Sequence, residues 1–175
     1  ITGAPRRGVG PHDVAIALVK ATFASGFVNN CVLEFCGPGI AALPIDYRNG
    51  IDVMTTETTC LSSIWETDGV TEGFYRAHQR PEDYRELHPA DGAYYDKYIE
   101  IDLSKVEPMI ALPFHPSNAY PLADVIADPE YYLGLVEAEA GKVFENNPDI
   151  RLDLRSKIVD GKIKVDQAAI AGCAA

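Results

Sequence analysis

The chain has 175 residues, 47% hydrophobic and 23% charged, which is enough apolar material for one sizeable core or a core with an appendage. The formal net charge of -11 would repel a phosphate backbone and disfavours a nucleic-acid partner. The apolar stretches are far shorter than the roughly 20 residues that a membrane span needs, which disfavours a membrane role.

The N-terminal part begins with a helical pattern and then an extended one. Pro11 and Asp13 favour a helix start, apolar residues then recur at helical spacing, and Gly26 supplies a stop. Residues 31–36 form a short apolar run before the turn at 37–39. This pattern predicts a buried strand followed by a tight turn.

The alternation continues along the first hundred residues. Pro44 and Asp46 favour a second helix, residues 61–65 a second core strand and residues 71–79 a third helix. Alternating strands and helices indicate an α/β fold, and we expect a three-layer α/β/α domain with a parallel or mixed sheet covered by helices.

Two further strands and a boundary follow. Residues 98–103 alternate strictly and predict a half-exposed edge strand, and residues 108–112 predict another short strand. A proline-rich segment begins at Pro113, where regular structure cannot persist. We therefore expect two parts, residues 1–112 and residues 113–175.

The second part is expected to add a C-terminal helix and hairpin extension. Asp128-Pro129-Glu130 begins an amphipathic helical pattern with an apolar stripe that includes Leu133 and Val136. In residues 158–163 the central pair Asp160-Gly161 is typical of a two-residue hairpin turn.

Four cysteines are scattered through the chain, at Cys31, Cys36, Cys60 and Cys173. Their spacing gives neither a CxxC pair nor a zinc motif, and we interpret the first three as small buried hydrophobes. A disulfide framework is disfavoured, and we expect a cytoplasmic protein.

Cys173 follows a run of small apolar residues and Gly172, which favours a thiolate presented at a strand end to a metal centre. Both ends look cut, and we expect a piece of a larger enzyme.

Residues 55–59 place one carboxylate, Glu57, among four threonine hydroxyls just before a core strand. Sheets of the α/β class place ligand-contacting groups there, so Glu57 could carry a proton or orient a substrate. The alternative, slightly favoured by the residues alone, is a solvated glutamate at a capped helix end. Of the scattered histidines, His115 has the most constrained setting, between Pro113 and Pro116, and we expect it to have a structural or interface role.

Several of these segments together resemble the second domain of the aconitase family of iron–sulfur hydro-lyases and the start of its third domain. The similarity keeps a consistent order over nearly the whole chain. The matching segments are Gly8–Val14, residues 32–39, Val53-Met54-Thr55-Thr56-Glu57 against the family's Asn-Met-x-x-Glu, residues 99–103 against its Ile-Glu-Ile-Asp-Leu strand, Pro113-Phe114-x-Pro116 against its linker, and Ala171-Gly172-Cys173 against its Gly-Ser-Cys motif.

The resemblance implies a hydratase that adds water to, or eliminates it from, a small di- or tricarboxylate with a [4Fe–4S] cluster held by three cysteines. Cys173 would be a cluster ligand, and Glu57 a catalytic carboxylate on the substrate side. Val53 replaces the family's Asn, which favours a substrate other than citrate or isocitrate. Since the other cluster cysteines have no counterpart here, we expect this chain alone to bind no cluster and to be inactive, its partners being the remaining domains of the parent chain.

Two other interpretations remain open. The first is a non-catalytic α/β scaffold or interaction domain from a parent that lacks the cluster. The second is a nucleotide-binding doubly wound domain, which the missing phosphate-loop signature disfavours. The glycine pairs at 8 and 10 and at 37 and 39 are better explained by loop geometry than by phosphate binding.

Overall fold

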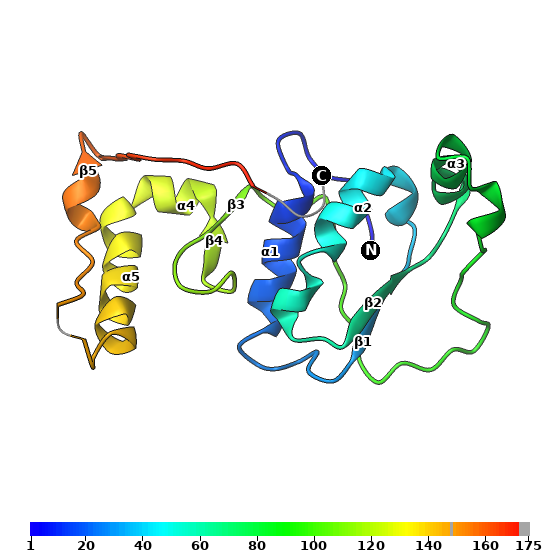
Figure 1. Ribbon diagram of the computed structural model, residues 1–175, viewed down its shortest axis with the longest axis horizontal. Helices are drawn as coiled ribbons and strands as arrows, with labels where there is room; N and C mark the ends of the chain where they lie inside the picture. Colours follow the sequence, from blue (N-terminus) through cyan, green and yellow to red (C-terminus); the bar gives the residue numbers. More distant parts are fainter. Residues whose placement is uncertain (148, 172–175) are drawn as a thin grey trace.

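The computed structural model describes residues 1–147 and 149–171. Its helices and strands extend along one long axis, with α3 at one end and α5 at the other (Figure 1). In chain order they are α1 (Pro11–Thr22), β1 (Val32–Phe35), η1 (Ile40–Ala42), α2 (Ile45–Asp52), η2 (Thr55–Thr58), β2 (Ser62–Trp65), α3 (Gly69–Ala77), η3 (Pro81–Asp83), β3 (Met109–Ala111), β4 (Ala119–Pro121), α4 (Leu122–Ala127), α5 (Pro129–Val143), η4 (Arg155–Lys157), β5 (Ile158–Val159) and β6 (Lys162–Ile163).

The α/β class predicted from the sequence is confirmed. Strands β1 and β2 pair in parallel, with Val32 opposite Ser62 and Phe35 opposite Trp65. The aromatic rings of Phe35 and Trp65 stack with their centroids 4.3 Å apart, which adds a side-chain contact to the strand pair. The right-hand half of the molecule in Figure 1 is built around this pair and the helices α1 and α2.

Helix α1 is fixed at its start and tied to a distant segment. Gly10 donates its backbone N–H to Asp13 Oδ2 at 2.6 Å, and Pro11 occupies the first helical position. The other oxygen of Asp13 accepts the N–H of Met109 at 2.6 Å, so the same side chain connects α1 to β3. The apolar face of α1 enters the main core, whose buried members are Val9, Val14, Leu18, Phe35, Ile40, Leu43, Ile51 and Leu103.

The predicted edge strand at residues 98–103 is wrong as a strand. The segment forms one isolated bridge, between Thr2 and Asp102, in which Thr2 donates to the Ile101 carbonyl and Leu103 donates to the Thr2 carbonyl, both at 2.9 Å. Gly3, the next residue, has φ +67°, so the chain turns away and the ladder cannot continue. Apolar alternation still directs Ile99 and Ile101 onto the core.

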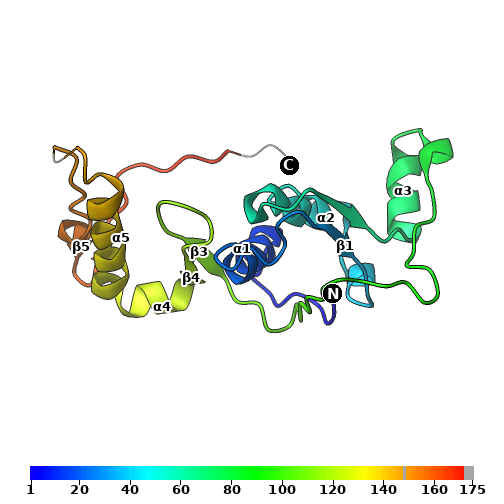
Figure 2. The ribbon, with the colours of Figure 1, turned by 90° about the horizontal axis from the view of Figure 1, so that it is seen from below.

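The C-terminal helix and hairpin extension is confirmed. Asp128 caps α5 by accepting the N–H of Tyr131 at 3.1 Å, and β5 and β6 pair in an antiparallel hairpin. Asp160 and Gly161 both have positive φ, 51° and 71°, as a two-residue hairpin turn requires. Beyond the hairpin, the extended residues 164–171 run back towards α1 in both views (Figures 1 and 2).

The helices of the described ranges are short. The longest, α5, has 15 residues. Within these ranges we find no helix with the length and apolar character needed to cross a membrane.

Candidate functional site

Glu57 lies on η2, the tight turn between α2 and β2. Two of the neighbouring threonines are buried and hydrogen-bond to the backbone: Thr55 Oγ1 donates to the Asp52 carbonyl at 2.8 Å, and Thr58 Oγ1 donates to the Thr55 carbonyl at 2.6 Å. The turn ends at Thr59, whose φ of 65° is left-handed. Two threonine hydroxyls thus hold the backbone of the turn, while the Glu57 side chain remains 45% exposed.

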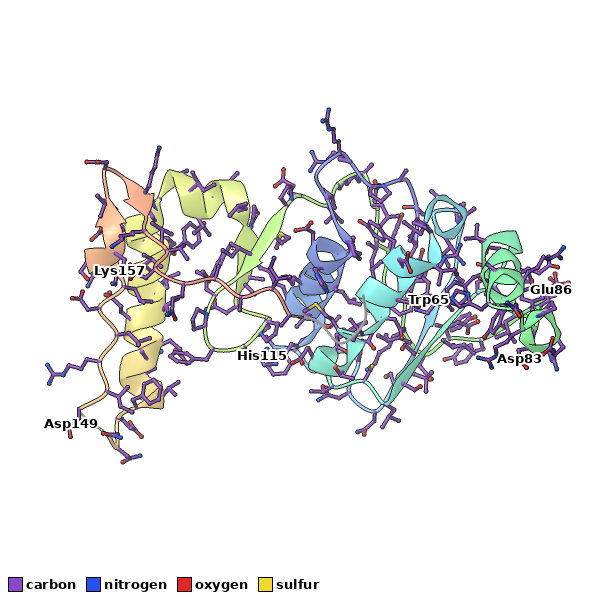
Figure 3. The ribbon with its side chains drawn as sticks, turned by 45° about the horizontal axis from the view of Figure 1, so that its top comes forward. Trp65, Asp83, Glu86, His115, Asp149 and Lys157 are labelled. Carbon is purple, nitrogen blue, oxygen red and sulfur yellow. The ribbon has the colours of Figure 1, made fainter. Side chains whose placement is uncertain are left out.

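His115 lies in the loop that joins β3 to β4, beside α1 (Figure 3). Its Nδ1 accepts the backbone N–H of Ser117 at 3.1 Å and lies 3.0 Å from the Ser117 hydroxyl. Its ring stacks on Phe23, the residue that ends α1, with centroids 3.8 Å apart and an interplanar angle of 23°. Both the position and the rotation of the imidazole are therefore fixed.

The structure brings Glu57 and His115 together. Glu57 Oε2 lies 3.8 Å from His115 Nε2, which is within ion-pair range and longer than a hydrogen bond. The sequence singled out both residues separately but gave no sign that they meet, because the contact joins η2 to a loop more than fifty positions further along the chain. The one local signal that pointed to His115 was its position between two prolines, Pro113 and Pro116.

The three cysteines within the described ranges are not the buried hydrophobes that the sequence predicted. Cys31, Cys36 and Cys60 are each half-buried. Cys60 follows η2 directly, and its thiol donates to the Thr55 carbonyl at 3.4 Å. Short strands flanked by loops explain the difference, because the ends of β1 and β2 are not covered on all sides.

A metal site is not assembled by the described part of the chain. Within residues 1–147 and 149–171 no group of three or more His, Cys, Asp or Glu side chains could hold a metal ion. The predicted cluster ligand, Cys173, lies outside the described residues. The described residues thus do not fit an iron–sulfur cluster by themselves.

The loop at residues 37–39 has a structural explanation. Gly37 donates its N–H to Glu66 Oε2 at 3.0 Å, and Gly39 donates to the Ile1 carbonyl at 2.9 Å. These two amides are already used within the chain, and one of them faces a carboxylate that would repel an anion. Loop geometry therefore accounts for this glycine pair.

The described cavities lie away from Glu57. A groove of about 540 Å³ runs between α1 and residues 99–109, with Val14, Leu18 and Ile99 among its apolar walls. A smaller cavity of about 210 Å³ lies among Glu34, Ile64, Trp65, Glu66, Leu87 and His88. Glu57 and His115 line neither of these two cavities.

The chain belongs to the aconitase family: the model of this family, described as aconitate hydratase, matches residues 1–175. The resemblance inferred from the sequence is thereby confirmed.

Curated relatives agree with this assignment. The 3-isopropylmalate dehydratase large subunit of Picrophilus torridus is 31% identical over 125 residues, covering 71% of this chain and 30% of the relative. The 3-isopropylmalate dehydratase large subunit of Campylobacter hominis is 33% identical, and the match covers 66% of this chain and 27% of the relative. The phosphinomethylmalate isomerase of Streptomyces viridochromogenes is 34% identical, covering 70% and 15%. The chain therefore spans less than a third of the length of these relatives.

Proposed function

We propose that this chain is part of a larger aconitase-family dehydratase that adds water to, or eliminates it from, a small di- or tricarboxylate. The family match and the dehydratase relatives support this assignment. Those relatives are named for 3-isopropylmalate, and Val53 replaces the asparagine of the family motif, so a branched dicarboxylate is favoured over citrate or isocitrate. The parent protein is expected to be cytoplasmic.

The observation that carries the proposal is the presentation of Glu57. Its carboxylate is half exposed on a turn whose backbone is fixed by buried threonines, at the position of the family's motif glutamate. A half-exposed carboxylate on a fixed turn can accept or return a proton at the carbon next to the departing hydroxyl. We assign Glu57 this role on the substrate side.

The rest of the site belongs to the remainder of the parent chain. Residues 1–112 would form the second domain, and residues 113–175 the linker and the beginning of the third domain. We assign Cys173 as a ligand of the [4Fe–4S] cluster, which would need two more thiolates from the parent chain and would supply Lewis-acid chemistry when bound. The chain alone is expected to bind no cluster and to have no turnover.

The test uses the full-length protein that contains this chain. After anaerobic iron–sulfur reconstitution, we expect a visible-absorbing cluster and turnover of 3-isopropylmalate in preference to citrate. Glu57→Gln should lower kcat by about 10²-fold or more, because it removes the proton acceptor and preserves the side-chain shape. Glu72→Gln, on the exposed face of α3, is the matched control and should leave kcat unchanged.

Two results would contradict the proposal. Full turnover in Glu57→Gln would remove the assigned role of the carboxylate. A folded full-length protein that takes up no iron or sulfide would favour the alternative, a non-catalytic α/β scaffold.

A further inference from the structure

We propose that His115 is a positioning residue that holds the Glu57 carboxylate in its working orientation. The inference rests on the proposed function of Glu57 and adds to it a second residue, from a different part of the chain. Three features carry it: the occupied Nδ1 of the imidazole, the fixed ring, and a carboxylate for which the described residues supply no other ion-pair partner.

The hydrogen bonding of His115 determines which ring nitrogen faces Glu57 with a proton. Nδ1 accepts from the backbone N–H of Ser117 at 3.1 Å, so this nitrogen carries no proton of its own. In the neutral ring the proton must then lie on Nε2. Nε2 is the nitrogen that faces Glu57 Oε2, at 3.8 Å. The nitrogen that carries the proton is therefore the one within ion-pair distance of the carboxylate.

The ring cannot readily turn away. One face stacks on Phe23 at 3.8 Å between centroids. The loop that carries His115 is closed by Asn118, whose backbone N–H donates to the His115 carbonyl at 2.8 Å and whose side-chain amide donates to the Pro113 carbonyl at 2.5 Å. His115 is only 35% exposed as a result.

Glu57, in contrast, has a fixed backbone and a side chain with three rotatable bonds. Among the described residues, His115 is the one cationic or imidazole side chain within ion-pair distance of its carboxylate. A carboxylate that must meet a substrate carbon in one orientation loses efficiency when it rotates freely, because a misplacement of about 1 Å can cost up to about 10²-fold in rate. The attraction between the Nε2–H of His115 and the carboxylate, across 3.8 Å, favours the orientations of Glu57 that point towards His115.

The experiment distinguishes the roles of the two ring nitrogens of His115 by substitution in the reconstituted full-length protein. His115→Asn keeps a polar group at the position of Nδ1, facing Ser117, and removes Nε2. His115→Gln places an amide at the position of Nε2. We expect His115→Asn to lower kcat on the order of 10-fold with KM nearly unchanged. His115→Gln should recover most of the loss, and because both variants lose the stack on Phe23 alike, their Tm values should be equal to each other.

Two comparisons complete the test. His78→Asn is the matched control, since His78 also uses Nδ1, towards the Phe74 carbonyl, but contacts no carboxylate in the described structure. In the Glu57→Gln background, His115→Asn should have no further effect on kcat, because both substitutions act on the same group.

A spectroscopic measurement on the labelled 175-residue chain needs no turnover. The ¹³C resonance of the Glu57 carboxylate should shift in His115→Asn and stay unchanged in His78→Asn, and ¹⁵N spectra should place the His115 proton on Nε2. An unshifted carboxylate, or a proton on Nδ1, overturns the inference. If Glu57→Gln loses turnover but His115→Asn does not, the inference about His115 is overturned and the proposed function stands. If Glu57→Gln retains turnover, both the inference and the proposed function are overturned.

Discussion

Arg48 is a buried guanidinium, 3% exposed, whose donors are all directed at acceptors of the chain. Nε donates to the Leu43 carbonyl at 3.0 Å, and Nη2 donates to the Ile40 carbonyl at 3.1 Å. Two further bonds, of 3.0 and 2.7 Å, run to the Asp68 carboxylate. Burial would raise the pKa of Asp68, but the hydrogen bonds from Arg48 and Thr71 outweigh it and hold this pKa below its ordinary value.

Replacing Arg48 should therefore be severe. Arg48→Met leaves the Asp68 charge and two buried carbonyls without their partner, and we expect the free energy of unfolding to fall by about 3–5 kcal/mol. Chemical denaturation measures the change. Arg76→Met is the control, because Arg76 is 70% exposed and its pair with Glu72 is worth no more than about 0.5 kcal/mol. Equal losses in the two variants would contradict this account.

His88 connects the segment that follows α3 to Glu66, the residue directly after β2. Its Nδ1 lies 2.7 Å from Glu66 Oε1, and its Nε2 lies 3.3 Å from Glu86 Oε1. The hydrogen bond to Glu66 is the main cause that raises the pKa of His88 above its ordinary value of 6.5, and the charge of Glu86 adds to it. The protonated ring thus stabilises the folded chain.

The sign of the pH dependence follows from this raised pKa. The stabilisation is fully present below about pH 6.5, where the ring is protonated in both folded and unfolded chains, and it is lost as the pH rises through the raised folded pKa. We expect the difference in unfolding free energy between wild type and His88→Asn to shrink as pH rises in this way. The same substitution at His78 is the control, and a difference independent of pH would contradict the assignment.

At the residue scale, the sequence identified Glu57 and its neighbouring hydroxyls but not their surroundings. Local spacing describes a turn, and the threonines of η2 do bind the turn's own backbone as such spacing suggests. The contact between Glu57 and His115 depends on how α1, η2 and the β3–β4 loop pack, and no local pattern encodes that packing.

At the scale of elements, Gly37 determines how β1 ends. Its φ is +111°, and a Cβ added there would lie 2.7 Å from the Ile1 carbonyl oxygen. Gly37→Ala should therefore cost about 1–3 kcal/mol of unfolding free energy, because strain and a backbone clash combine. Denaturant titration of the variant measures the loss.

Gly73→Ala provides the matched comparison. Gly73 lies inside α3, has no neighbour within 4 Å of an added Cβ, and should gain about 0.5–1 kcal/mol from the better helix propensity of alanine. A stabilising Gly37→Ala would refute the role of the left-handed conformation.

Element types followed from the sequence where the signals were local. Helix starts at Pro11 and Asp128 and the Asp160-Gly161 turn lie where capping and turn chemistry predict them. The failure at residues 98–103 has a different origin. The alternation of apolar and polar residues indicates which side chains face a core. A strand also needs a partner strand, and here the partner segment turns away after Thr2.

At the scale of the whole molecule, Glu137 joins α5 to the start of η4, the turn that leads into the C-terminal hairpin. It accepts the N–H groups of Leu154 and Arg155 at 2.6 and 2.8 Å and pairs with the Arg155 guanidinium at 2.6 Å. The hydrogen bond from the Arg155 backbone, followed by that from its side chain, holds the pKa of Glu137 below its ordinary value. One carboxylate thus organises the end of the molecule opposite α3 (Figure 2).

Loss of that carboxylate charge should act locally. We expect Glu137→Gln to increase amide exchange in residues 154–163 and to leave exchange in α1 and β1 unchanged, because the extension contacts the main core through few elements. Hydrogen exchange with mass spectrometry measures both regions. Glu139→Gln, an exposed neighbour on the same helix that pairs with Lys142, is the control. Faster exchange across the whole chain would show that the extension and the core unfold together.

Within the described ranges, β1 and β2 form a parallel sheet of two strands, and this has a practical consequence for the behaviour of the polypeptide in solution. A sheet of two strands has unpaired main-chain donors and acceptors along its edges, and an extended segment of another chain can pair with them. Val32, Leu61 and Ile64 are exposed beside these edges, at 58%, 66% and 44%. Lysine replacements at these three positions are the natural starting point for keeping copies of the polypeptide apart at high concentration.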